Sequence, residues 1–317
     1  RNILGSLLVI FFLAASVHAA DKIRIAFPDL AAQFVPLPLG EKKDFFREEG
    51  LQVEFIRVRP AVAMAALVSG EIDYYTVIGP GVTAAIQGMP LKVVACYAPG
   101  APIALITRPE FKSVRELKGQ SIGINGFGAA THITARLIFK HFGLDPDKEI
   151  KFLDTGPLEA RFAAMSRGLS AGTVGSPPTD FLGKKLGFVV LARAHELFSY
   201  PVSGLVATVR KVKERPYEIK QVIKAGIKAN RYMYHDREGT IQVMMHWLKI
   251  DKEMATATYE GVLKAFNEDG SIPEKGLRLV IEEAKKTANV HRDVSLSDVA
   301  DFTILGEAQK ELGIKGR

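Results

Sequence analysis

Short apolar runs alternate with helix-like segments along the first two thirds of the chain. Residues 23–27 (IRIAF) and 51–59 (LQVEFIRVR) have the period of two that is typical of strands. The segment between them (LGEKKDFFREEG) has a helical pattern that ends at Gly50, and the next helix begins at Pro60 and ends at Gly70. Strands separated by helices of this length predict a parallel, doubly wound α/β sheet.

One short sequence pattern occurs in both halves of this α/β region. Residues 67–81 read LVSGEIDYYTVIGPG, and residues 165–179 read MSRGLSAGTVGSPPT. Each consists of a helix end, a glycine, a short apolar run and a turn of Gly, Pro or Ser, although Asp73 has no acidic counterpart at Ala171. The repeat predicts two α/β lobes, and we expect a ligand where the carboxyl ends of their strands face each other.

The chain changes character after Pro216, where amphipathic helices follow one another. These helices cannot form a sheet domain of their own, so we expect them to pack against the first lobe. The predicted organisation is a signal peptide at residues 1–19, the first part of lobe 1 at 20–105, lobe 2 at 106–203, and a return to lobe 1 with C-terminal helices at 204–317.

The N-terminal segment is the strongest compositional signal. Residues 3–17 are nearly all apolar, which is short for a membrane span of about 20 residues. The residues that follow predict a signal peptide that is cleaved after Ala19, and hence an exported, soluble chain. The alternatives are an uncleaved anchor and a buried helix.

Composition and charge disfavour several classes of protein. With 317 residues, 47% hydrophobic and 24% charged, the chain suits two folded domains. Its net charge of +7 is spread without a basic block, so we expect no nucleic-acid partner and a mild preference for anions. Cys96 is the single cysteine, and no nucleophile elbow, Walker A, zinc-protease or Cys/His metal pattern occurs. These features predict a binding protein without catalytic residues, cofactor or metal.

Several segments of the chain together carry a family resemblance. They read, in order, IRIAF, PLPLGEKKDFFREEGLQVEFI, ALVSGEIDYY, GMPLKVVA, SVRELKGQSIGI, HFGLDPD and ADFTILGEAQKELG. Over residues 22–315 their order and spacing resemble the solute-binding proteins of ABC transporters in the nitrate/sulfonate/taurine-binding (NMT1/THI5-like) superfamily. The chain departs from that pattern at Ala171, where the family has Asp, and at Gly40 and Asp44, where Ala and Gly are usual.

The resemblance implies a fold of the periplasmic binding protein type II-like class, with two doubly wound α/β lobes, a hinge, and a C-terminal helical region packed on lobe 1. It also implies a periplasmic protein that captures a small organic anion by hinge closure and delivers it to an ABC permease in the inner membrane. We expect a monomer. Two alternatives remain open. One is an exported or cytoplasmic enzyme similar to the thiamin-pyrimidine synthases, whose cysteine-rich motif is missing here. The other is a ligand-binding partner of a sensor.

Candidate ligand contacts follow from the predicted strand ends. The turn that begins at Gly126 precedes a helix, whose N-terminus favours an anion by about 0.3–1 kcal/mol at an exposed site. The guanidinium of Arg59 can pair with a carboxylate or sulfonate through two hydrogen bonds. Aromatic side chains, Tyr97 among them, would suit an organic ligand, whereas His132 is expected on a helix face. The candidate ligand-binding residues are Pro28, Asp29, Leu30, Gln33, Phe34, Arg59, Ile78, Gly79, Ala98, Pro99, Gly126, Phe127, Gly128, Thr131, Ser176, Pro177 and Tyr200.

Overall fold

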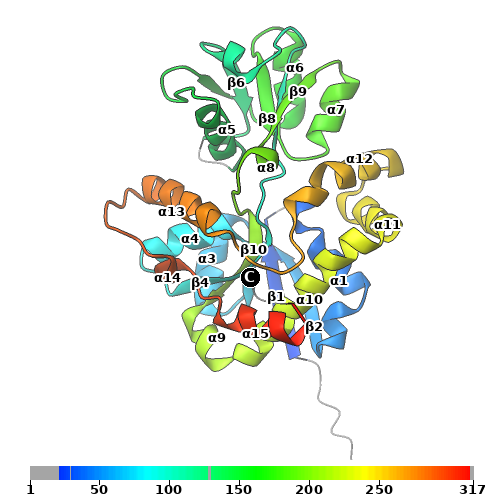
Figure 1. The fold of residues 1–317 in the computed structure, drawn as a ribbon, viewed down its shortest axis with the longest axis vertical. Helices are drawn as coiled ribbons and strands as arrows, with labels where there is room; N and C mark the ends of the chain where they lie inside the picture. The colour runs from blue at the N-terminus through cyan, green and yellow to red at the C-terminus, as the bar shows by residue number, and fades with distance from the viewer. Residues whose placement is uncertain (1–20, 29, 128–129, 315–317) are drawn as a thin grey trace, which may run out of the picture.

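The computed structural model describes residues 21–28, 30–127 and 130–314, which form two α/β lobes joined by a hinge (Figure 1). The predicted signal peptide at residues 1–19 lies outside the described residues. Among the described residues, no helix is both long enough and apolar enough to cross a bilayer.

Lobe 1 is built on a five-stranded sheet with the strand order β2-β1-β3-β10-β4. The strands are β1 (Asp21–Phe27), β2 (Leu51–Arg57), β3 (Tyr74–Val77), β4 (Leu91–Ala98) and β10 (Ser203–Thr208). Strand β1 pairs in parallel with β2 and β3, but β10 pairs antiparallel with β3 and β4. The prediction of an all-parallel sheet is therefore wrong, because β10 enters lobe 1 from lobe 2 and runs against its neighbours.

Lobe 2 repeats this layout with the strand order β7-β6-β8-β5-β9. The strands are β5 (Ala104–Thr107), β6 (Ser121–Ile124), β7 (Lys151–Asp154), β8 (Gly172–Gly175) and β9 (Val189–Arg193). Strand β6 is parallel to β7 and β8, whereas β5 is antiparallel to β8 and β9. In each sheet four strands thus run in one direction and one strand is reversed, and the reversed strand is the first that the chain forms after crossing between the lobes.

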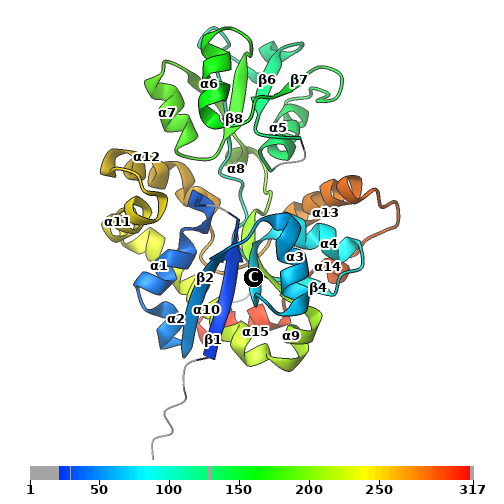
Figure 2. The ribbon, with the colours of Figure 1, turned by 180° about the vertical axis from the view of Figure 1, so that it is seen from behind.

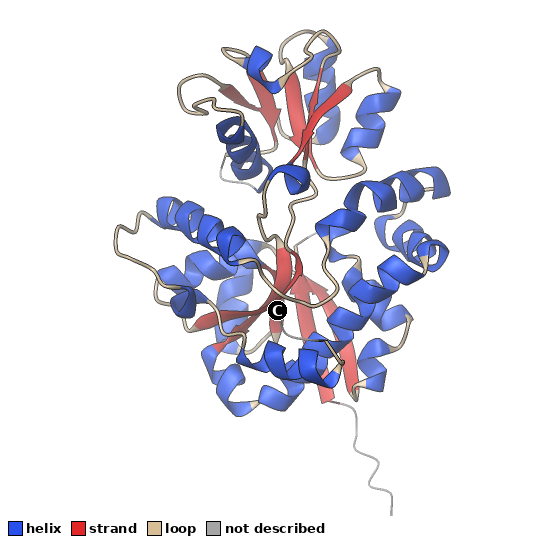
Figure 3. Cartoon of the chain, in the orientation of Figure 1, coloured by secondary structure: helices blue, strands red, loops and turns tan. Residues whose placement is uncertain are grey.

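Helices cover both faces of each sheet (Figure 3). In lobe 1 they are η1 (Ala32–Phe34), α1 (Pro36–Lys42), α2 (Phe45–Glu48), α3 (Pro60–Ser69), α4 (Ile78–Ile86), α9 (Val209–Glu214), α10 (Pro216–His235), α11 (Arg237–Leu248), α12 (Lys252–Val262), η3 (Leu263–Ala265), α13 (Glu274–Ala288), α14 (Leu296–Val299) and α15 (Thr303–Glu311). In lobe 2 and the hinge they are η2 (Val114–Leu117), α5 (Ala130–His141), α6 (Leu158–Ser166), α7 (Thr179–Lys185) and α8 (Ala194–Leu197). The helix expected over LGEKKDFFREEG is in fact α1 and α2, because Asp44 between them has a left-handed φ of 63°.

Successive residues of the central strands supply two separate cores. On β1, Ile25 packs into the cluster formed with α10 and α15, and Ala26 packs into the cluster formed with α3 and α4. Both side chains are fully buried. A strand that is covered on both faces is apolar at successive positions, which explains the apolar runs in the sequence.

The C-terminal helices pack mainly on lobe 1, as predicted. Helix α10 lies against α1, α2 and α15, and α13 lies against α4. Two of these helices also approach lobe 2 from opposite sides of the hinge (Figure 1). On one side α12 contacts α7, where Lys185 Nζ lies 2.8 Å from Glu253 Oε2. On the other side Lys140 of α5 faces Glu283 of α13 across 3.8 Å.

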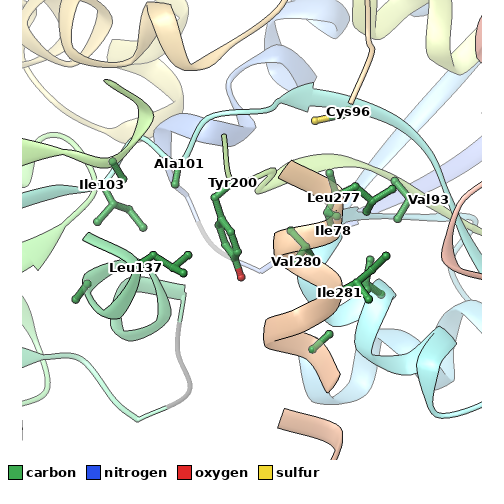
Figure 4. Packing of buried hydrophobic residues seen from close by; sticks show 14 of the residues in the cluster. Ile78, Val93, Cys96, Ala101, Ile103, Leu137, Tyr200, Leu277, Val280 and Ile281 are labelled. Atoms are coloured by element: carbon green, nitrogen blue, oxygen red, sulfur yellow. The ribbon is translucent and has the colours of Figure 1, made fainter. Parts of the chain in front are cut away.

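The hinge consists of two chain segments, residues 99–103 between β4 and β5 and residues 194–202 between β9 and β10. Two hydrogen bonds join these segments, Ala194 N–H to the Ile103 carbonyl (2.9 Å) and Ser199 Oγ to the Pro99 carbonyl (2.9 Å), and Val202 N–H donates to the carbonyl of Ala98 at the end of β4 (3.0 Å). An apolar cluster continues beside this crossing (Figure 4). In it, Tyr200 lies between Leu137 of α5 and Val280 of α13.

Candidate functional site

The carboxyl ends of the parallel strands in the two lobes face each other. Strand β1 runs from the outer end of lobe 1 toward lobe 2, and its parallel neighbours β2 and β3 have the same direction (Figure 2). In lobe 2, β6 leads into the loop before α5 on the side that faces lobe 1. Ligands of α/β sheets bind at such carboxyl edges, so the residues after these strands form the candidate site.

The loop after β1 supplies a polar group to this edge. Pro28 and Gln33 are half-buried, and Leu30 is exposed. The Gln33 Oε1 atom is buried and has no hydrogen-bond partner among the described residues, which leaves it available to a donor. Phe34 is only 2% exposed and packs near Phe27, so its side chain belongs to the core and not to the site. Asp29, also a candidate, lies outside the described residues.

Arg59 is the cation of the lobe 1 edge. It caps the start of α3 after β2 and its side chain is exposed. Within the described residues, its guanidinium forms no hydrogen bond and no ion pair. The nearby Arg57 behaves differently, because its Nε donates to the Pro28 carbonyl at 3.2 Å and so holds the loop after β1. Arg59 therefore remains available for a ligand.

The turn after β3 presents a backbone surface rather than side chains. Helix α4 begins at Ile78, directly after the strand. Ile78 is fully buried in the core, so its side chain does not reach the site. Gly79 is half-buried, and a Cβ built there would meet no atom within 4 Å. A ligand can therefore approach the Gly79 backbone closely.

Three candidates near the hinge have structural roles. The side chains of Ala98 and Tyr97 are buried in the lobe 1 core. Pro99 lies in the crossing segment, and its carbonyl accepts the Ser199 bond described above. Tyr200 fills the apolar cluster beside the hinge, where burial raises the pKa of its phenol. The side chains of Ala98 and Tyr200 are thus occupied in packing, and the Pro99 carbonyl in the hinge, so these residues do not present groups to a ligand.

The loop after β6 presents an aromatic ring to solvent. Phe127 is 64% exposed, and its ring lies edge-on to His132 at 5.2 Å, which in turn lies 4.8 Å from Phe152. Burial lowers the pKa of His132, which favours the neutral ring. Gly126 has a φ of 148°, a region open to glycine, and Thr131 Oγ1 donates to Asn125 Oδ1. Gly128 lies outside the described residues.

The first two residues of the turn after β8 have different surroundings. Ser176 is half-buried at the strand end, whereas Pro177 is buried. A Cβ built at Gly261 of α12 would lie 3.7 Å from the Pro177 ring, so Pro177 packs beneath a helix of the C-terminal region. Pro177 is therefore a contact between the lobes, and Ser176 remains a candidate for the ligand.

The structure thus brings nine of the candidate residues to the two facing edges. We call this group the strand-end site: Pro28, Leu30, Gln33, Arg59, Gly79, Gly126, Phe127, Thr131 and Ser176. Two surface hollows occur elsewhere, one along β9 from Phe188 to Arg193 and one between α3 and the turn before β4. We favour the strand-end site over these hollows because it collects residues from both lobes at parallel strand ends. Within the described residues, no group of side chains could hold a metal ion.

Sequence analysis missed one residue beside this site. Arg161, in the first turn of α6, is only 7% exposed, and its Nη1 donates to Thr173 Oγ1 at 3.3 Å and to the Val174 carbonyl. A signal existed, because Arg161 stands one turn before the fully buried Met165 on the apolar face of the helix. Arginine is almost never buried at a core position unless it is paired.

Two α/β lobes on a two-segment hinge, with parallel strand ends facing each other, define the architecture of the periplasmic binding proteins. Solved structures with this fold include the periplasmic aliphatic sulphonate binding protein SsuA from Escherichia coli, with a TM-score of 0.73 and 17% identity over 89% of this chain and 92% of that one. They also include the periplasmic nitrate-binding protein NrtA from Synechocystis PCC 6803, with a TM-score of 0.72 and 14% identity over 92% of this chain and 89% of that one. The predicted fold class is confirmed.

The sequence comparisons agree with the fold. A profile described as NMT1/THI5 like matches residues 31–239, and the chain belongs to this family. A relative from Brucella abortus (strain 2308), provisionally described as a binding protein, is 25% identical over 259 residues, which is 80% of each chain. The resemblance found in the sequence motifs is therefore confirmed.

Proposed function

We propose that this protein is a periplasmic solute-binding protein of an ABC importer, and that it captures a small organic anion of the carboxylate or sulfonate type between its lobes. The observation that carries this proposal is the strand-end site, in which parallel strand ends of two hinged lobes face each other. A ligand that touches both edges stabilises the closed arrangement of the hinge. The relatives support the proposal, because those described above are named as binding proteins for sulphonate or nitrate, or for an unstated ligand.

The donors at the site favour an anion. Helices α4 and α5 both begin at this edge, one in each lobe, and a helix N-terminus carries partial positive charge and free N–H groups. Arg59 adds a full charge, and the hydroxyl of Ser176 can donate a further hydrogen bond, whereas the hydroxyl proton of Thr131 is already donated to Asn125 Oδ1. The exposed rings and methyls of Phe127 and Leu30 suit an apolar body on the ligand.

Export, delivery to a permease and a monomeric state are part of the same proposal. Residues 1–19 would direct the chain to the periplasm, and a membrane permease would receive the ligand. A permease and an ATPase encoded beside this chain would favour import, whereas a neighbouring receptor would favour the sensor alternative.

Binding is preferred to catalysis because the one thiol is inaccessible. Cys96 is fully buried in β4, and burial raises the pKa of its thiol well above the usual range. A buried thiol in apolar surroundings is a poor nucleophile. No observation in the described part of the chain favours the enzyme alternative.

A thermal-shift screen of carboxylates, sulfonates and nitrate, beside neutral and cationic solutes, tests the anion proposal. At 100 times its dissociation constant an anion should stabilise the protein by about 2.7 kcal/mol. The single Trp247, whose ring lies 5.0 Å from that of Phe27 at the end of β1, offers a second readout by its fluorescence. A neutral or cationic solute that raises the melting temperature when no anion does would contradict the proposal, and consumption of a bound solute would favour the enzyme.

A further inference from the structure

One buried charge in the described part of the chain forms no ion pair, and the only opposite charge that acts on it is Glu159, two residues away on the same helix. Five ionisable side chains from acids and arginine are buried there, and four of them are carboxylates with a cation close by. These pairs are Glu49 with Lys228 (2.7 Å), Asp180 with Arg193 (2.5 Å), Glu218 with Lys211 (2.6 Å) and Glu283 with Lys286 (2.6 Å). The fifth is Arg161, whose polar contacts are with neutral oxygens only.

The guanidinium of Arg161 lies beneath the lobe 2 edge of the strand-end site. Its contacts with Thr173 and the Val174 carbonyl place it on the last half of β8, two residues before Ser176. Its Cγ would lie 3.6 Å from a Cβ built at Gly123 of β6. The charge is therefore centred between the ends of β6 and β8, within the lobe that carries Phe127.

One edge of this guanidinium is unused. Both of its hydrogen bonds are made by Nη1, whereas Nε is buried and has no partner among the described residues. The Nε–Nη2 edge is the one that can hold two oxygens of a carboxylate or sulfonate at once. Burial lowers the pKa of Arg161, but an arginine stays charged in proteins. An unpaired buried ion is strongly unfavourable, so an anion that reaches this edge would gain a large charge interaction.

We propose that Arg161 binds the acid group of the ligand, so that the anionic end lies against β6 and β8 of lobe 2 and the remainder extends toward lobe 1. This inference rests on the proposed function and assigns the charge contact to a residue that is not among the candidates from the sequence. It also predicts that the ligand places one compact acid group at this contact, because a single guanidinium edge donates to two oxygens of the same group.

Calorimetric titration with two matched pairs of probes tests this assignment: ethanesulfonate with ethanesulfonamide, and benzoate with benzamide. The wild-type protein should prefer an acid to its neutral amide. Arg161→Gln should weaken acid binding by about 10- to 100-fold and leave amide binding nearly unchanged. Arg161→Lys keeps the charge but not the two-bond edge, so its affinity for the acids should lie between those of the wild type and Arg161→Gln. Arg136→Gln, on α5 of the same lobe and paired with Asp147, is the matched control and should bind as the wild type does.

The outcomes separate this inference from the proposed function. Equal acid affinity in Arg161→Gln and wild type overturns the role of Arg161 and leaves the anion-binding proposal intact. Equal weakening of acid and amide also overturns it, because that result shows a structural role. If Arg161→Gln does not fold, the test is the acid affinity of Arg161→Lys relative to that of the wild type, together with the preference of the wild type for an acid over its amide. Failure of both acids to bind the wild type counts against the proposed function and this inference together.

Discussion

The two lobes share a strand layout but differ in the buried charge that lies beside their central strands. In lobe 1, Asp73 precedes β3, accepts the Arg24 N–H at 2.8 Å and lies 2.8 Å from Lys211 Nζ, which also contacts Glu218. The corresponding position in lobe 2 is the buried Ala171, whose carbonyl accepts the Arg108 N–H at 2.9 Å. Lobe 1 therefore uses its buried charges to join the sheet to α10, whereas lobe 2 pairs its buried Asp180 with Arg193 but gives the buried Arg161 no ion pair.

The difference indicates that the two lobes have different tasks. Lobe 1 collects the helices that follow the second crossing, and a paired network fixes α10 on its sheet. Lobe 2 is smaller and holds its cation under the edge where the ligand is proposed to bind. A charge that stabilises the fold should have its opposite charge within the fold. A charge that binds a ligand should form its ion pair with the ligand instead.

Removal of Lys211 tests the lobe 1 side with the largest expected effect. Lys211→Met leaves Asp73 and the buried Glu218 without their shared cation, and breaking a buried pair costs about 3–5 kcal/mol. Because Lys211 keeps some exposure and Arg215 still neighbours Glu218, we expect a loss of about 3 kcal/mol in the free energy of unfolding. Urea denaturation measures it. Lys22→Met, in an exposed pair with Glu54, should change it by less than about 1 kcal/mol. Equal effects of the two variants would contradict a structural role for the network.

Substitutions at two glycines of α4 should distinguish an effect on core packing from an effect on ligand binding. A Cβ at Gly81 would lie 2.6 Å from Val206 Cγ2, so Gly81→Ala should lower the free energy of unfolding by about 1–3 kcal/mol through overpacking. Gly79→Ala has open space and should stay within about 1 kcal/mol of wild type. We expect Gly79→Ala instead to weaken the stabilising anion by about tenfold in a titration. If Gly79→Ala binds the anion as tightly as the wild type does, Gly79 does not contact the ligand.

Replacement of Arg161 by an apolar side chain tests the lobe 2 side. Arg161→Met removes an unpaired buried ion and keeps much of its volume, so the free energy of unfolding should rise by about 1 kcal/mol or stay unchanged. The same urea denaturation applies. A loss above about 2 kcal/mol would show that Arg161 is needed for the fold, and the contrast between the lobes would fail.

The smallest expected effect concerns pH and the hinge. Burial lowers the pKa of His195 in α8 below its ordinary value of 6.5, with a smaller contribution from Arg193 and an opposing one from Glu196. The folded state therefore favours the neutral ring, and its stabilising contribution is present above the unfolded pKa and is lost as pH falls through the folded one. Unfolding midpoints should decrease between about pH 7 and pH 5, and His195→Gln should flatten this decrease. An unchanged slope in the variant would assign the decrease to other groups.

Most of the fold could be predicted because its signals are local. The period of two in β1 and β2, and the glycines that end the helices, are visible in short windows of sequence. The reversed directions of β5 and β10 are not, because they depend on how the chain crosses between lobes. The break at Asp44 was also hidden, since the apolar pattern continues on both sides of it.

The site could be predicted only as a set of loops. The rule that ligands bind at strand ends led to Gln33, Gly79 and Ser176. It did not distinguish them from Phe34 or Ile78, because an apolar residue at a strand end can face either the core or the ligand. Arg161 was missed because its surroundings come from β6 and β8, which lie near it only after folding.

A crystal structure of the protein with the most stabilising anion tests the central claim most directly. The account predicts electron density between the carboxyl ends of β1–β3 and β6–β8, with the acid group within hydrogen-bond distance of Arg161. An anion bound in the hollow along β9, in the hollow beside α3, or between the lobes with its acid group far from Arg161 would contradict that claim.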